Sequence, residues 1–187
     1  MNIVTFLSLF LLIVCGTGPV NSQTNVLDSL MLITREPRTT GEKIKTYNML
    51  AAGLRSTDRY RAAEMAEKAM TLAIGIDDRR GLADAYTIKG QLSEDSDSFS
   101  EALNFYLQAL DIYIELDSET DIANLHSLAG SVCKTLGNYD KAIEHCHASL
   151  RIYEKLNNKN GIAYIYRVLG SVYKYKGDYD KSLHYYF

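Results

Sequence analysis

The chain contains little that would interrupt helices or attract polyanions. Only two of its 187 residues are proline, and neither lies beyond Pro37, so long helices are possible over the rest of the sequence. Lys and Arg number 20 against 23 Asp and Glu, for a formal charge of −3. Without a basic excess, neither nucleic acid nor an anionic membrane surface is an expected partner.

Sequence motifs for catalysis or cofactor binding are also missing. There is no phosphate-binding P-loop, dinucleotide-binding glycine pattern, nucleophile elbow or HExxH pair. Neighbouring carboxylates such as Glu94 and Asp95 diverge on a helix and do not converge on a substrate. We therefore expect no catalytic residue and no cofactor.

A metal site is not expected either. His145, Cys146 and His147 are consecutive, and consecutive helical residues point about 100° apart, so they cannot bind one ion together. A site joining Cys146 to Cys133 and His126 has no recognised ligand spacing. His126 is otherwise predicted to be an isolated helical histidine, as is His184 in the last repeat.

What the sequence does contain is enough apolar material for a core. Apolar residues make up 47% of the chain and charged residues 23%, which is typical of a globular protein and not of a disordered one. The length suits one domain of ordinary size, with or without an export signal.

The N-terminal segment is predicted to be a signal peptide over residues 1–22. Residues 3–15 are almost uniformly apolar and would form a helix of about 20 Å, short of the ~30 Å hydrocarbon core of a membrane. Val20 and Ser22 suit the positions before a cleavage site. We expect an exported chain, periplasmic or secreted, without stable membrane insertion after cleavage. The alternatives are an uncleaved anchor, because no Lys or Arg precedes the run, and lipidation of Cys15.

The remaining sequence repeats with a fixed period. Aligned with residues 121–147, residues 161–187 are identical at ten of 27 positions. Glycine recurs at positions 90, 130 and 170, at the same interval. A constant period of about 40 residues predicts a stacked-repeat fold. The predicted units are 41–80, 81–120, 121–160 and 161–187, the last one incomplete.

Each unit is predicted to form two antiparallel helices. Residues with short polar side chains recur where a second helix would begin, and such residues cap helix N-termini: Asp58, Ser98, Asn138 and Asp178. Ser98 and Glu101 have the spacing of a capping box. Gly137 and Gly177, just before two of the caps, allow the positive φ that ends a first helix.

The segments GNYDKAIEHC (137–146) and LGSVYKYKGDYDKSLHYY (169–186) resemble the tetratricopeptide repeat (TPR). The resemblance covers 41–187 and implies an all-α fold, a right-handed α-solenoid of stacked antiparallel helix pairs. Its units are longer than the usual repeat of about 34 residues, and in this they resemble a long bacterial variant. The first helices of such repeats line a concave groove that binds extended peptides or partner helices.

The two ends of the array carry further expectations. Residues 23–40 form an N-terminal extension in which 25–33 would be a short capping helix. The first unit departs from the pattern, having Leu50 where the others have glycine, and is predicted to act as an N-terminal cap. The chain stops inside a second helix, so we expect either a fragment of a longer protein or a partner that covers this end.

Polar side chains on the first helices are the candidate groove residues. Residues 81–120 carry one basic and nine acidic side chains, whereas 161–187 carry four and two. This gradient would place the acidic part of an extended peptide near the C-terminal units; the alternative is an ordinary solvated face. The second unit offers Asp84, Thr87, Gln91 and Glu94. The peptide-binding candidates of the third and fourth units are Asn124, Ser127, Ser131, Lys134, Tyr164, Arg167, Ser171 and Lys174.

Together these features predict an exported, non-catalytic scaffold that binds a protein or peptide in its concave groove. The alternative is the periplasmic input region of a signal-transduction protein, since similar TPR regions occur in Bacteroidetes-like histidine kinases, nucleotide cyclases and DNA-binding regulators. Cys133 and Cys146 are predicted to be buried between paired helices, with a disulfide as the alternative for an exported chain.

Overall fold

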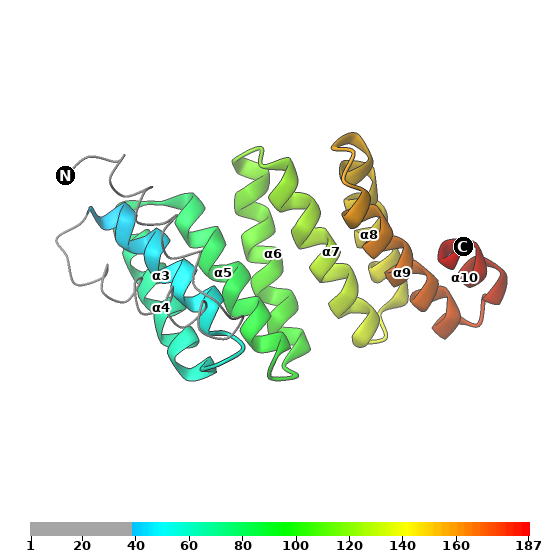
Figure 1. Ribbon diagram of the computed structural model, residues 1–187, viewed down its shortest axis with the longest axis horizontal. Helices are drawn as coiled ribbons and strands as arrows, with labels where there is room; N and C mark the ends of the chain where they lie inside the picture. The colour runs from blue at the N-terminus through cyan, green and yellow to red at the C-terminus, as the bar shows by residue number, and fades with distance from the viewer. Residues whose placement is uncertain (1–38) are drawn as a thin grey trace, which may run out of the picture.

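The computed structural model describes residues 39–187, which form helices joined by short turns. The helices lie side by side in one row from the N-terminal to the C-terminal end (Figure 1). The predicted signal peptide and the capping helix at 25–33 lie outside the described residues. The helices are α3 (Thr40–Leu54), α4 (Arg59–Ile76), α5 (Arg79–Glu94), α6 (Phe99–Glu115), α7 (Glu119–Thr135), α8 (Tyr139–Lys155), α9 (Lys159–Lys176) and α10 (Tyr179–Tyr186).

Consecutive helices pack in pairs, and the pairs stack. Each helix contacts the one before and the one after it, and the first helices also contact one another, α3 with α5 and α7 with α9. This is the predicted α-solenoid of antiparallel helix pairs. All four predicted second helices begin directly after their predicted N-cap residues. The first unit, which departs from the repeat pattern in sequence, is also a complete hairpin of α3 and α4.

Most of the turns share one backbone geometry. A residue with positive φ stands immediately before the N-cap residue, whose N–H donates to the carbonyl oxygen five residues earlier. This is the Schellman arrangement for ending a helix. It recurs at half the sequence period, so both kinds of turn use it. The positive-φ residues are Asp77, Asp97, Asp117, Gly137, Asn157 and Gly177.

The predicted capping box of the second unit is wrong. Ser98 makes no side-chain capping hydrogen bond. Glu101 is engaged elsewhere, because its Oε2 accepts a hydrogen bond of 3.0 Å from the hydroxyl of Ser93, at the end of the preceding helix. A capping box does occur at the start of α3, where Thr39 and Glu42 exchange hydrogen bonds.

The repeated turn makes Gly137 a test of backbone geometry. Gly137→Val should lower the free energy of unfolding by about 1–2 kcal/mol, because a β-branched residue is strained at positive φ. Nothing lies within 4 Å of a Cβ at this position, so the cost would come from the backbone alone. Gly137→Asn is the matched control, because Asn157 already adopts φ 53° in the equivalent turn. Equal melting temperatures for the two variants in thermal denaturation would contradict this explanation.

Paired helices approach closely where the recurring glycines lie. A Cβ on Gly90 would lie 2.4 Å from the ring of Tyr106, and one on Gly130 would lie 2.9 Å from Cys146 Sγ. Gly170 faces the Tyr186 ring in the same way. Because successive glycines of this set lie one repeat apart, the period in the sequence records a repeated contact between two helices.

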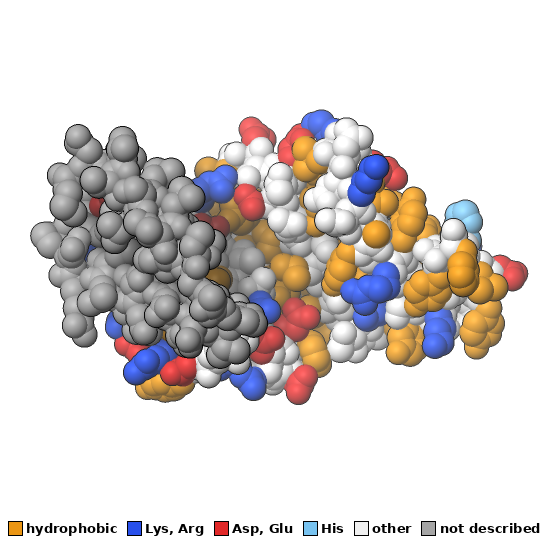
Figure 2. All heavy atoms as spheres, in the orientation of Figure 1, with side chains coloured by type: hydrophobic (Ala, Val, Ile, Leu, Met, Phe, Trp, Pro, Cys, Tyr) orange, Lys and Arg blue, Asp and Glu red, His pale blue; other side chains and the backbone are white. Residues whose placement is uncertain are grey.

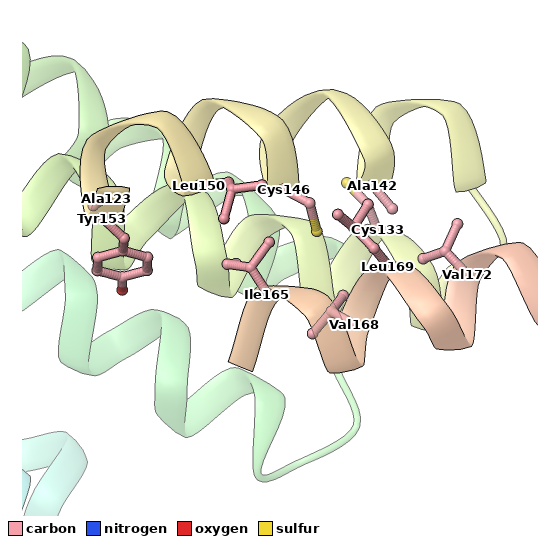
Figure 3. Close-up of a cluster of buried hydrophobic side chains, with 10 residues drawn as sticks. All are labelled: Ala123, Cys133, Ala142, Cys146, Leu150, Tyr153, Ile165, Val168, Leu169 and Val172. Atoms are coloured by element: carbon pink, nitrogen blue, oxygen red, sulfur yellow. The ribbon is translucent and has the colours of Figure 1, made fainter. Parts of the chain in front are cut away.

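The two cysteines lie in the C-terminal core cluster. Cys133 and Cys146 are fully buried free thiols among aliphatic side chains of α8 and α9 (Figure 3). Burial raises the pKa of both thiols, that of Cys146 to about 12. Both therefore act as small apolar core residues. Among residues 39–187, no helix has the length and hydropathy needed to cross a bilayer.

Candidate functional site

A groove of about 640 Å³ runs along the first helices. Four first helices supply most of its lining, and two tyrosines reach it from second helices. Figure 2 views the molecule as in Figure 1, with apolar side chains exposed over α7, α9 and α10 and Lys or Arg among them. The lining consists of Lys45, Asn48, Met49, Ala52, Asp84, Thr87, Ile88, Gln91, Tyr113, Asp121, Asn124, Leu125, Ser127, Leu128, Tyr153 and Tyr164.

The candidate residues fall into two groups. Three of them, Asn124, Ser127 and Tyr164, line this groove. The others lie on α7 and α9 outside its lining: Ser131, Lys134, Arg167, Ser171 and Lys174. From the second unit, Asp84, Thr87 and Gln91 line the groove. Glu94 does not, and it accepts a hydrogen bond of 2.8 Å from the Tyr106 hydroxyl.

Sequence reasoning missed the contribution of α3. Four of its residues line the groove, although none of the candidate groove residues lies in the first unit. Among them, Asn48 is 6% exposed, and its Nδ2 donates a hydrogen bond of 2.9 Å to the Gly81 carbonyl oxygen. That bond fixes the orientation of the amide, and Asn48 Oδ1 is left buried without a hydrogen-bond partner among the described residues. A buried acceptor without a donor is costly, and because this oxygen has almost no accessible surface, a ligand could reach it only if the surrounding side chains moved.

Two tyrosine hydroxyls organise the polar side chains of the groove. Tyr113 donates to the carboxylate of Asp84. Tyr153 donates to Asn124 Oδ1 at 2.7 Å. The two contacts are equivalent, because both partners of the second are displaced by one repeat from those of the first. The sequence could have indicated these contacts through two tyrosines at equivalent repeat positions. It does not show by itself that their hydroxyls reach the groove.

The centre of the groove is acidic. Burial raises the pKa of Asp84, and the Tyr113 hydrogen bond and the Arg80 charge oppose that rise only in part. Arg80 lies over the Tyr113 ring at 5.6 Å and pairs with Asp121 at 3.4 Å. Burial leaves the ionised carboxylate of Asp84 poorly solvated. A cationic or N–H donor group of a ligand placed beside it would replace that lost solvation and be stabilised.

Cationic side chains follow beyond the C-terminal end of the groove. Arg167 lies with its guanidinium 4.9 Å from the ring centre of Tyr164, which lines the groove. Arg167 and Lys174 are both exposed. Arg167 is not placed in any ion pair within residues 39–187, and neither is Lys174. They are therefore available to a ligand.

The expectation that His126 is isolated is wrong. Its Nδ1 lies 2.9 Å from Nδ1 of His145 across the α7–α8 hairpin. The separation of the two residues along the chain hides this pair in the sequence, and it appears only when the two helices are placed antiparallel. Within the described residues, no group of three or more His, Cys, Asp or Glu side chains is arranged to hold a metal ion.

Comparison with known families confirms the repeat predicted from the sequence. Residues 121–186 match the sequence model of the Tetratricopeptide repeat family. This match covers the α7–α8 and α9–α10 hairpins, and α3–α6 continue the same hairpin architecture. A search of curated proteins gives no match.

Solved structures support the fold over most of the chain. BtubC from P. vanneervenii is 20% identical with a TM-score of 0.73, and the match covers 88% of this chain and 68% of that one. A Rap protein complexed with competence and sporulation factor is 19% identical with a TM-score of 0.77, and the match covers 89% of this chain and 48% of that one. A signal-transduction ATPase with a tetratricopeptide repeat sensor from Pyrococcus horikoshii is 19% identical with a TM-score of 0.76. That match covers 88% of this chain and 25% of the other one. This chain therefore spans less than half of each of the last two proteins.

Proposed function

We propose that this protein is a non-catalytic scaffold that binds an extended peptide segment of a partner protein in the groove of α3, α5, α7 and α9. The observation that carries the proposal is the groove itself, about 640 Å³ in volume and lined by apolar side chains together with convergent polar ones. The amides of Gln91 and Asn124, which are respectively half-buried and exposed in this lining, offer hydrogen bonds to a peptide main chain. Peptide recognition combines such main-chain bonds with pockets for side chains.

The charges of the groove suggest the polarity of the bound segment. Asp84 and Asp121 at its centre favour a segment with apolar and basic side chains. Arg167 and Lys174, beyond Tyr164, favour acidic side chains further along the same segment. Electrostatic complementarity of this kind sets orientation and selectivity more than affinity.

The comparisons support a binding role. One similar structure is a Rap protein complexed with competence and sporulation factor, and another protein carries a tetratricopeptide repeat sensor. The sensor of the second protein also favours the alternative function, the input region of a signal-transduction protein. For the present chain we propose export, on the basis of the apolar segment and cleavage pattern in residues 1–22.

A peptide library displayed on phage and selected against the full chain tests the proposal. We expect enriched peptides to share apolar and basic positions followed by acidic ones, and to bind the purified chain in solution. Arg167→Glu/Lys174→Glu should weaken the binding of the acidic-ended peptides and leave peptides lacking those acidic positions unchanged. No enrichment over a bare support, or equal affinities for parent and double variant, would reject the proposed groove polarity.

A further inference from the structure

Three of the described hairpins carry an aromatic pair at one recurring position. In the second hairpin Tyr86 stacks on Phe105, with ring centres 6.1 Å apart. In the fourth, Tyr166 meets Tyr185 edge to face at 5.8 Å. The third hairpin places His126 and His145 at the same repeat positions, with ring centres 5.2 Å apart. Among the described hairpins, only this one has a pair made of two rings that titrate near neutral pH.

The distance between the two imidazoles sets their protonation state. With Nδ1 atoms 2.9 Å apart, one nitrogen donates a proton and the other accepts it. Protonation of one ring alone leaves a donor and an acceptor at this contact, whereas protonation of both rings would remove the hydrogen bond and bring two N–H groups and two positive charges face to face. The rings are half-buried at the α7–α8 contact, so water screens that repulsion only in part.

The surrounding charges give little compensation. The charges that act on the two rings all come from α8. Glu144 favours protonation, whereas Lys141 and Arg151 oppose it. Within the described part of the chain, no charged side chain of α6 or α9, the neighbours of this hairpin, acts on either ring. Burial is the largest influence and lowers the pKa of both histidines, that of His126 to about 4.

We propose that the His126–His145 pair makes the third hairpin an acid-sensitive element, in which protonation separates α7 from α8 while the flanking hairpins stay closed. The direction follows from linkage. The unfolded chain takes up protons near the ordinary histidine pKa of about 6.5, whereas the folded pair takes them up only at lower pH. Stability that is present at neutral pH is therefore lost as the pH falls from about 6.5 toward 4.

This inference does not depend on the proposed peptide binding. One consequence of it does depend on peptide binding. Because α7 supplies Asn124, Ser127 and Leu128 to the groove, a peptide bound there would be released more readily in acid. An unfolding experiment on the unliganded chain tests the histidine pair by itself, and its outcome is separate from that of the peptide selection.

The test compares the parent with His126→Tyr/His145→Phe, which copies the pair of the second hairpin. Thermal unfolding of the full chain is followed by circular dichroism from pH 7.5 to 4.5 in buffers containing EDTA, so that metal ions do not contribute. We expect the unfolding equilibrium of the parent to shift toward the unfolded state by up to about tenfold per pH unit for each histidine kept unprotonated. The double variant should lose this part of the pH dependence.

His147→Gln is the matched control, because His147 lies on the same helix outside the pair, and it should retain the parent's pH dependence. Parallel curves for the parent and the double variant would overturn the proposal. Imidazole NMR titration of the parent gives a readout that does not depend on how well any variant folds. Both His126 and His145 should titrate below the ordinary range, and midpoints near the ordinary value of about 6.5 for both rings would equally overturn the proposal.

Discussion

Gly90→Ala should lower the free energy of unfolding by about 2 kcal/mol, although alanine is the better helix former. The new Cβ would lie 2.4 Å and 2.6 Å from two ring carbons of Tyr106 and 3.2 Å from the Ala102 carbonyl oxygen. The ring has little room to move, because Tyr106 is fully buried and its hydroxyl is held by Glu94. Thermal or denaturant unfolding followed by circular dichroism measures the loss.

Gly75→Ala is the control for this prediction. Gly75 also lies in a helix, α4, but nothing lies within 4 Å of a Cβ there. This substitution should therefore stabilise the chain by up to about 1 kcal/mol through helix propensity. Gly130→Leu should also be destabilising, by about 1–3 kcal/mol, because a Cβ there already meets Cys146 Sγ at 2.9 Å. If Gly90→Ala and Gly75→Ala changed stability in the same direction, the close helix contact would be ruled out.

The fold was predictable because the same physical constraints recur in successive repeats. Gly130 and Gly170 mark a repeated close contact, and Asn138 and Asp178 mark a repeated helix start. A constraint that recurs leaves a period in the sequence even where each residue alone is ambiguous. The capping box at Ser98 was a local pattern without such support, and in the structure Ser93 binds the glutamate instead.

The candidate site was predictable only in part, because a groove depends on how hairpins are placed relative to one another. Asn124 and Ser127 share one stripe of α7 and both line the groove, because one helix face is set by sequence spacing alone. Asn48 was missed, because its role depends on the Gly81 carbonyl of the next hairpin. The His126–His145 pair was missed for the same reason: it joins two helices across a turn, and no pattern within either helix reveals it.

The groove predicts a large loss of binding when one small residue in it is enlarged. Ala52 is exposed and lines the groove on α3, so an added side chain would occupy the space of a ligand without disturbing the core. Ala52→Arg and Ala52→Glu should each weaken binding of a selected peptide by at least about tenfold, which corresponds to about 1.4 kcal/mol. Using both charges separates occlusion, which both variants cause, from electrostatics, which would weaken binding in one variant and strengthen it in the other. Isothermal titration calorimetry measures the affinities.

Ala63→Arg provides the matched control for these substitutions. Ala63 is equally an exposed helical alanine, but it lies on α4 and outside the groove lining. The variant should therefore bind the peptide as the parent does, and all three variants should keep the parent's melting temperature, because an exposed helical site accepts Arg or Glu at little cost. Peptide affinity that fell equally in Ala63→Arg and Ala52→Arg would place the binding site elsewhere on the solenoid. Affinity lost only at Ala52 would locate the peptide between α3 and α5, where Asn48 Oδ1 lacks a donor among the described residues.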